Sequence, residues 1–380
     1  MKDRKIALVI KTDGLEYDDR VRKEILSVQK IYPNIKFKIL AMLPDNLKKD
    51  GLTGYGVPYK SLYVPAREKY PSASKTTLKA WQFYKAVKRE VNEFDAVWVA
   101  NVDAAFVPMF LKHKRILWDL HELPMQFTGN MPLRVLLRHT FDRCKVIVHA
   151  NPQREQYLES IGIIKDSSKH FALRNYPDFE ELDRDYDALY NSFIDWKGER
   201  RCVYLQGLNM DRRAPFESIR AVLSIPDLCA VVVGGFDASI KRRLEEAFGD
   251  QLQERVLFIG KIPQLKIPQY IKQCYTTLVF YKNVSPNNYY CEANRFYQAV
   301  VLGLPVVVGN NPSMRELVEE YGFGVSIEDD GCSINKIVEG LKTVVERYDE
   351  YRENIINNRN QLIWDKQEPV LSSLVNKLFS

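Results

Sequence analysis

The sequence predicts an α/β protein of two consecutive lobes, each a doubly wound, Rossmann-like parallel sheet covered by helices. Three observations lead to this fold class. The chain has 380 residues, more than one ordinary core accommodates. Short runs of Val, Ile and Leu alternate with amphipathic helical patterns, and this alternation lapses once near the middle of the chain. Its content of 46% hydrophobic and 27% charged residues is that of a globular protein.

The first lobe is predicted over residues 1–175. Its apolar runs have the length of strands, and the helical patterns between them are long enough to cover one face of a sheet. The expected strands are Lys5–Lys11, Phe37–Met42, Ala96–Ala100, Arg115–Leu120 and Lys145–Ala150, and the expected helices are Asp19–Ile31, Thr76–Glu93, Leu133–Arg143 and Gln153–Ile161.

An acidic, aromatic connector over 176–200 is the expected linker, and the second lobe is expected over 201–350. Residues 351–380 form a helical, charged tail that we expect to cross back onto the first lobe. Ligands of doubly wound sheets bind beyond the carboxyl ends of the strands, so a cleft between the lobes is the expected site. The expected strands are Cys202–Gln206, Ala230–Val233, Val256–Ile259, Thr277–Tyr281 and Pro305–Val308, with helices that begin near Arg213, Ser239, Pro263, Ala293 and Ser313.

Several common signatures of enzyme chemistry are missing from the sequence. No Gly-x-Gly-x-x-Gly follows a strand, and there is no Walker loop, Gly-x-Ser-x-Gly or His-Glu-x-x-His. These gaps disfavour dehydrogenases, P-loop NTPases, serine hydrolases and zinc peptidases, and no bound metal or cofactor is expected. Any phosphate would have to be held by basic side chains and helix N-termini.

A loop in the second lobe has the residue types of an anion site. Gln206–Ala214 leads from a strand end into a helix start and contains Gly207, Arg212 and Arg213. Free N–H groups at a helix N-terminus and the fork of an arginine both favour a diphosphate. The alternative is a surface loop with two solvated arginines.

A second segment, Ser285–Val308, carries a resemblance to a known family. It reads as a loop with Pro286-Asn287, a helix with Glu292, and then Gly303-Leu-Pro305-Val-Val. This string is similar to the donor-site signature of the retaining family-four (group 1) glycosyltransferases of bacterial polysaccharide biosynthesis, which have the two-lobed GT-B fold. The family usually has carboxylates where this chain has Tyr290 and Gln298. The resemblance implies that Glu292, Asn294, Arg295 and Gln298 bind the donor.

Other segments match the family in the same order. Gly207 and Arg213 precede the first helix of the second lobe, and Gly234 and Gly235 follow its next strand. In the first lobe, the matching segments are Asp-x-Arg-Val, Asp-x-His-Glu and the stretch that closes the lobe. The residues that the resemblance places on the acceptor side are Asp18, Arg20, Asp119, His121, Glu122 and Asn175.

The resemblance implies transfer of a hexose from a UDP- or GDP-sugar to a saccharide or lipid-linked saccharide, with retention and without a metal, in polysaccharide or glycoconjugate biosynthesis. His121, Glu122, Arg213 and Arg295 are the expected catalytic residues, because the arginines would stabilise the departing diphosphate. Two alternatives stay open: a non-hydrolysing nucleotide-sugar epimerase, and a GT-B protein that binds ligands without catalysis. Tyr290 and Gln298 favour the second.

Charge is unevenly distributed along the chain. Residues 1–175 contain 31 Lys and Arg against 19 Asp and Glu, whereas the remainder contains 24 against 30. With the basic helical patterns Leu133–Arg143 and Thr76–Lys88, this excess predicts contact between the first lobe and an anionic membrane surface. No nucleic-acid-binding motif accompanies it, so nucleic acid is not an expected partner. Lacking an apolar stretch of about 20 residues, the chain is expected in the cytoplasm, at the inner face of the membrane.

Overall fold

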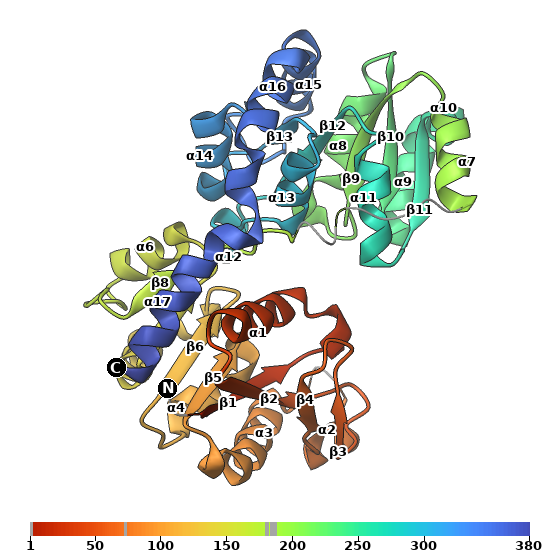
Figure 1. The fold of residues 1–380 in the computed structure, drawn as a ribbon. Coiled ribbons are helices and arrows are strands. Elements are labelled where there is room, and N and C mark those ends of the chain that lie inside the picture. Colours follow the sequence, from red (N-terminus) through yellow and green to blue (C-terminus); the bar gives the residue numbers. More distant parts are fainter. Residues whose placement is uncertain (1–2, 72–73, 179–181, 183–187) are drawn as a thin grey trace. The chain divides into compact units, whose positions relative to one another are not determined.

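The computed structural model describes residues 3–71, 74–178, 182 and 188–380. The chain divides into two compact units (Figure 1). Unit 1 consists of Met1–Asn175 together with Gln367–Ser380, and unit 2 is Tyr176–Lys366.

Unit 1 is built on an eight-stranded sheet of order β3-β4-β2-β1-β5-β6-β7-β8, in which β3 and β4 pair antiparallel and the other neighbours are parallel. The central strands are apolar along their length because helices cover both faces. The strands are β1 (Arg4–Lys11), β2 (Ile35–Met42), β3 (Lys49–Leu52), β4 (Pro58–Ser61), β5 (Ala96–Ala100), β6 (Ile116–Leu120), β7 (Val146–His149) and β8 (His170–Ala172). The helices are α1 (Asp19–Ile31), α2 (Pro65–Lys69), α3 (Thr76–Glu90), α4 (Phe106–Phe110), α5 (Met131–Arg143), α6 (Pro152–Ser160) and α17 (Glu368–Phe379).

Three strands of this sheet, β3, β4 and β8, are missing from the sequence prediction. They are three or four residues long and lie at or next to the sheet edges. In β3, Lys49-Asp-Gly-Leu52, no residue is buried. Edge strands need no continuous apolar run, so their sequences carry little signal.

Unit 2 has a six-stranded parallel sheet of order β11-β10-β9-β12-β13-β14. Alternation along β9 divides its side chains between two cores: Cys202 and Tyr204 face one, and Val203 and Leu205 face the other. The strands are β9 (Arg201–Gln206), β10 (Leu228–Val233), β11 (Val256–Gly260), β12 (Thr276–Val279), β13 (Val306–Val308) and β14 (Gly324–Ser326). The helices are α7 (Ala188–Lys197), α8 (Pro215–Leu223), α9 (Ala238–Phe248), α10 (Asp250–Arg255), α11 (Ile267–Ile271), α12 (Pro286–Tyr289), α13 (Asn294–Val301), α14 (Pro312–Tyr321), α15 (Ile334–Glu346) and α16 (Tyr348–Asn358).

The segment expected as a linker, 176–200, belongs to unit 2 wherever the structure describes it. It contains α7, and Tyr176 and Phe193 are buried in the same core as β9. Tyr176, Tyr190 and Phe193, three of the aromatic residues that suggested a connector, are core residues. Residues 179–181 and 183–187 of this segment lie outside the described part of the chain.

The tail returns to unit 1 later than residue 351. Ile355 and Leu362 are buried in the core of unit 2, and the crossing begins at Gln367. Helix α17 then packs against α1, β7 and β8. Lys30 Nζ lies 2.8 Å from Glu368 Oε1, and Tyr32 Oη lies 2.8 Å from Ser372 Oγ. Among the residues with described positions, no helix is both long and apolar enough to cross a bilayer.

Candidate functional site

A cavity of ≈ 370 Å³ lies in unit 2, at the carboxyl ends of β9, β10 and β11. Apolar side chains and carboxamides share its wall, which is the mixture expected of a small-molecule site. The lining residues are Gln206, Val233, Gly234, Lys261, Ile262, Gln264, Ile267, Asn294 and Gln298.

Gln298 is the most deeply placed polar group of this wall. It is 7% exposed, and its carboxamide has no hydrogen-bond partner among the described residues. Asn294 lies one helical turn earlier on α13 and lines the same cavity, because positions i and i+4 share a helix face. Because this carboxamide lines the cavity and can both donate and accept hydrogen bonds, it is suited to meeting the hydroxyl groups of a ligand.

Two arginines flank the ring of Tyr281. The guanidinium carbons of Arg213 and Arg295 lie 5.5 and 4.9 Å from the ring centroid. Arg213 Nη1 donates to Gly207 O at 2.7 Å, and Arg295 Nη1 donates to the Tyr281 hydroxyl at 3.3 Å. Both Nε atoms are buried and donate to no group in the described part of the chain. Burial, opposed by Tyr281 and assisted by Arg295, lowers the pKa of Arg213. Guanidinium N–H groups that are not used within the protein are suited to an anion.

Gly207 joins this arginine pair to the cavity. Its φ is +66°, and a Cβ atom there would lie 2.3 Å from Arg213 Nη1. On its other side, a Cβ on Gly234, a lining residue with φ +106°, would lie 3.4 Å from Gly207 N. Glycine at both positions lets the backbone run between the arginines and the cavity without side chains.

Three other residues were expected at the donor site: Gly235, Glu292 and Arg212. Gly235 is close to Lys261, whose Cε would be 3.3 Å from a Cβ at that position. Glu292 accepts a hydrogen bond from the Tyr297 hydroxyl. Arg212 is exposed, and its backbone carbonyl accepts from Lys282 N at 2.7 Å.

Five polar residues of this region were not predicted from the sequence. Lys261 and Gln264 line the cavity beyond the end of β11, and Gln206 ends β9. Tyr281 and Lys282 follow β12. The Lys282 charge is matched by Asp211 at 3.1 Å and Glu217 at 2.9 Å. The five residues lie at or shortly after the carboxyl ends of strands, and this position was the sequence signal that could have identified them.

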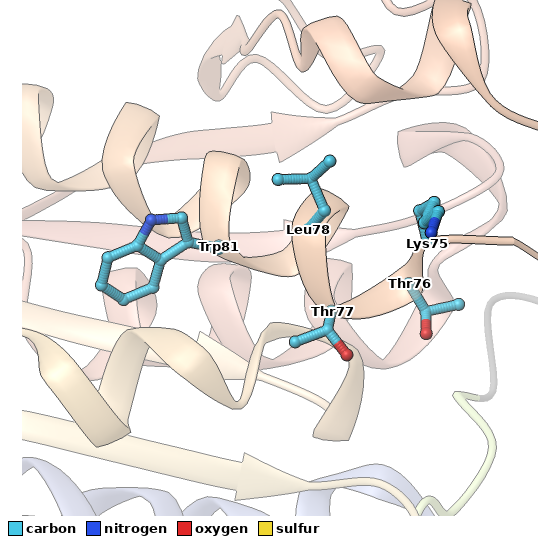
Figure 2. A pocket seen from close by; sticks show the side chains of 5 residues that line it. All are labelled: Lys75, Thr76, Thr77, Leu78 and Trp81. Atoms are coloured by element: carbon cyan, nitrogen blue, oxygen red, sulfur yellow. The ribbon is translucent and has the colours of Figure 1, made fainter.

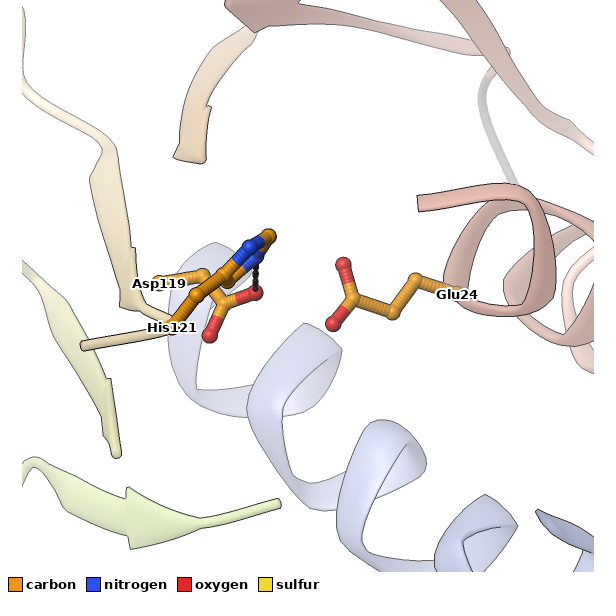
Figure 3. Close-up of side chains that lie close together, drawn as sticks. All are labelled: Glu24, Asp119 and His121. Atoms are coloured by element: carbon orange, nitrogen blue, oxygen red, sulfur yellow. Dashed lines mark hydrogen bonds and ion pairs between the residues drawn. The ribbon is translucent and has the colours of Figure 1, made fainter. Parts of the chain in front are cut away.

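A second group of charges lies in unit 1, at the end of β6 and on α1. Arg20 donates to both carboxylate oxygens of Asp119, at 3.0 and 2.8 Å, and to Leu173 O at 2.9 Å. His121 Nε2 lies 2.8 Å from Asp119 Oδ2. Figure 3 shows the Glu24 carboxyl group facing Asp119 and His121. Burial alone would raise the pKa of Asp119, but Arg20 and His121 hold it well below its usual range.

Glu24, Asp119 and His121 offer potential metal-ligand atoms within 4.8 Å of one another. Arg20 engages both Asp119 oxygens and lies 2.9 Å from Glu24 Oε1, so a guanidinium already supplies the positive charge there. The cluster is an arginine-centred charge network in this structure. Glu24 was not predicted, although its i+4 position from Arg20 places both on one helix face.

Three further residues were expected on the acceptor side. Asp18 is the N-cap of α1, where its Oδ1 accepts from Val21 N at 3.4 Å. Glu122 is exposed, while the neighbouring His121 side chain is 19% exposed. Asn175 ends the first stretch of unit 1.

Residues 214–362 match the family model "Glycosyl transferases group 1". They form a group 1 glycosyltransferase domain. This group 1 domain contains Asn294, Arg295 and Gln298, while Gly207 and Arg213 lie directly before the matched region. No curated protein matches the chain.

Solved structures share the fold of the whole chain. One is sucrose-phosphate synthase of Thermosynechococcus elongatus, with a TM-score of 0.78, 15% identity and 99% of each chain covered. Another is HepE of Anabaena in complex with UDP and glucose, with a TM-score of 0.71, 15% identity and coverage of 98% of this chain and 99% of HepE. A UDP-N-acetylglucosamine 2-epimerase has a TM-score of 0.63, 13% identity, and 98% and 94% coverage. With two parallel-sheet units and its group 1 domain, the chain has the GT-B fold.

Proposed function

We propose that this glycosyltransferase transfers a hexose from a nucleoside-diphosphate sugar to a saccharide or lipid-linked saccharide, with retention, in cell-surface polysaccharide or glycoconjugate biosynthesis. The observation that carries the proposal is the pair Arg213 and Arg295, whose buried Nε atoms donate to no described group, near a cavity of the same unit. In this assignment the nucleoside occupies the cavity and the diphosphate lies against Gly207, Arg213 and Arg295. The complex of HepE with UDP and glucose supports a UDP-sugar as the first donor to test, with a GDP-sugar second.

The nucleoside would meet chemically matched groups in the cavity. Val233, Ile262 and Ile267 offer apolar surface to the flat base, and the Gln298 carboxamide can both donate to and accept from ribose hydroxyls. Gln298 is an amide at a position where the related family usually has a carboxylate. The ribose contact would therefore be neutral.

In the proposed reaction, the bond between the sugar anomeric carbon and the diphosphate oxygen breaks, and a bond to the acceptor hydroxyl oxygen forms on the same face. The acceptor proton passes to the departing diphosphate. Charge accumulates on that diphosphate, and Arg213 and Arg295 would stabilise it. His121, fixed by Asp119, would orient the acceptor, and the exposed Glu122 is a second candidate.

A thermal-shift screen with UDP-, GDP-, ADP-, CMP- and dTDP-sugars tests this site. We expect stabilisation by one class of nucleotide, and Arg213→Ala should weaken its binding by about 1.5–3 kcal/mol, roughly 10- to 150-fold, since hydrogen bonds to charged groups are lost. Arg212→Ala removes the same charge from an exposed neighbour and should change affinity little. Equal losses in both variants, or no stabilisation by any nucleotide, would contradict the assignment.

An epimerase on the same fold is the second candidate, because a UDP-N-acetylglucosamine 2-epimerase shares the architecture. It would release an epimerised sugar from the donor without any acceptor. Incubation of the protein with donor alone, followed by product analysis, separates the two reactions. Tight nucleotide binding with no turnover of any donor would favour the non-catalytic alternative.

We also propose that unit 1 contacts an anionic membrane at the cytoplasmic inner face through α3 and α4. Leu78, Trp81 and Phe110 are large apolar side chains that are 38%, 37% and 40% exposed, and the rings of Trp81 and Phe110 lie 5.5 Å apart. Figure 2 shows Leu78 and Trp81 at a shallow hollow that begins at Lys75. Residues 74–89 contain five Lys and Arg and no Asp or Glu. Aromatic side chains among cations suit the interface of an anionic bilayer.

A further inference from the structure

Glu24 is a buried carboxyl group that lacks a donor of its own. It is 1% exposed, and neither of its oxygens has a hydrogen-bond partner in the described part of the chain. Arg20 Nε lies 2.9 Å from Glu24 Oε1, but the N–H group of this nitrogen donates to Asp119 Oδ2 at 3.0 Å. Arg20 Nη2 donates to Asp119 Oδ1, and Arg20 Nη1 donates to Leu173 O. Glu24 therefore has a positive neighbour but receives no hydrogen bond from it.

The charges of the network do not balance if both carboxyl groups are ionised. One guanidinium faces two carboxyl groups, Glu24 and Asp119, and all three groups are almost fully buried. Asp119 receives two donors from Arg20 and one contact from His121, so it is the group stabilised as a carboxylate. An ionised Glu24 would be a buried charge without donors, which is strongly unfavourable.

We infer that Glu24 retains its proton at neutral pH and directs it toward Asp119, which makes Glu24 a positioning residue for the Asp119–His121 pair. Figure 3 shows the Glu24 carboxyl group aimed at this pair. Held between Arg20 and Glu24, the Asp119 carboxylate keeps the orientation in which it meets His121 Nε2. The role in catalysis rests on the proposed function of His121 at the acceptor side, whereas the protonation state does not.

Charged and titratable groups of α1, β6, α6 and β7 lie around the cluster of Glu24, Asp119 and His121. Burial raises its pKa most, Asp119 and then Asp18 raise it further, and Arg20 opposes them. His121 shares Asp119 with Arg20, and Arg154 of α6 donates to the His121 carbonyl. The buried His149 of β7 has a lowered pKa, so it adds no positive charge at neutral pH.

The protonation state is tested by comparing wild type with Glu24→Gln, a neutral side chain of the same shape. Above the ordinary pKa of 4.5, the folded wild type holds a proton that the unfolded chain has lost, so its stability falls as pH rises. Glu24→Gln has no titrating group at this position, so it lacks this decrease in stability. We expect the Tm of Glu24→Gln, minus that of wild type, to increase steadily from about pH 5 to about pH 8. For Glu93→Gln, at an exposed position, the Tm difference from wild type should not change with pH.

The positioning role is tested by activity. Glu24→Gln should keep kcat/KM within about threefold of wild type, because its amide N–H can still donate toward Asp119, whereas Glu24→Ala should lose roughly tenfold or more. A flat Tm difference for Glu24→Gln would overturn the protonated state without reference to any substrate. Glu24→Gln as inactive as a folded Glu24→Ala would overturn the positioning role. Absence of transferase activity in wild type would instead count against the proposed function.

Discussion

Among single residues, Gly207 is the position where a small substitution should most strongly disturb the proposed donor site. Arg213 donates to its carbonyl, and the guanidinium occupies the space that a Cβ atom would need. The same carbonyl contact fixes Arg213 against Tyr281. One methyl group at position 207 should therefore displace the arginine.

Gly207→Ala is expected to abolish measurable nucleotide stabilisation and to lower stability by about 1 kcal/mol or somewhat more, because alanine is disfavoured at positive φ. Gly249→Ala is the matched control. Gly249 has φ +50° with no atom within 4 Å of its would-be Cβ, so it carries the backbone cost alone. In a thermal-shift assay, nucleotide should stabilise Gly249→Ala but not Gly207→Ala. Unchanged nucleotide binding by Gly207→Ala would refute the steric explanation.

Two buried histidines make unit 1 sensitive to acid. His149 Nε2 lies 2.9 Å from His170 Nδ1, so a single hydrogen is shared between the two rings. Burial lowers the pKa of both groups, and that of His170 falls from 6.5 to about 4. A neutral histidine stabilises the fold above its unfolded pKa, and this contribution disappears as pH falls toward the folded value.

We expect the stability of the wild type to decline between about pH 6.5 and 4, by up to about 3 kcal/mol for His170. His170→Asn cannot take up a proton in this range and should show a shallower decline. Denaturant unfolding at pH 7, 6, 5 and about 4 measures the difference. Parallel declines in the two proteins would exclude His170 as the titrating group.

At the scale of helices and strands, α17 ties distant parts of the sequence together. Leu371, Leu374 and Leu378 are fully buried against unit 1, and contact with α1 accounts for the polar links to Lys30 and Tyr32. The helix is therefore part of the unit 1 core.

Leu374→Ala should destabilise unit 1 by about 2–5 kcal/mol, the usual effect of a cavity at a buried leucine. Ser373→Ala, one position earlier and exposed, should stay within about 0.5 kcal/mol of wild type. Circular dichroism during denaturant unfolding reports both. A Leu374→Ala protein as stable as Ser373→Ala would show that α17 contributes little to the core.

The elements that the sequence predicts well are those with strong periodic signals. The central strands β1, β5, β9 and β10 are apolar runs buried on both faces, and α1 begins and ends where expected. Edge strands such as β3 and β14 lack that signal, since only one neighbour and little burial define them. The start of the tail crossing depends on which core receives each apolar residue, and local pattern does not contain that information.

The candidate site was predictable in part for the same reason. On α13, Asn294 and Gln298 share one face and line the cavity, while Arg295 lies on another and meets Tyr281. Helical spacing alone separates these roles. Lys261 and Gln264 come from a different loop, and their approach to Gln298 depends on the order of strands in the sheet.

At the scale of the whole molecule, the basic excess of residues 1–175 and the exposed aromatics of α3 and α4 predict binding to anionic vesicles. Association should fall with salt, as each basic residue near the surface contributes about 1 kcal/mol. Trp81→Ala should weaken sedimentation with vesicles containing phosphatidylglycerol. Leu52→Ala, which also removes an exposed apolar side chain from unit 1, should not, and Leu52 is 69% exposed. Equal binding to neutral phosphatidylcholine vesicles would refute an electrostatic contact.

The return of the chain at Gln367 also sets an order of events during synthesis. The ribosome completes all of unit 2 before it makes the segment that covers α1, β7 and β8. Until then, the surfaces of α1, β7 and β8 that α17 covers are exposed, and the nascent first unit stays open to chaperones and proteases. Unit 2, which is contiguous, can fold in the meantime. A premature stop after unit 2 would thus expose the earlier half of the protein while sparing the later one.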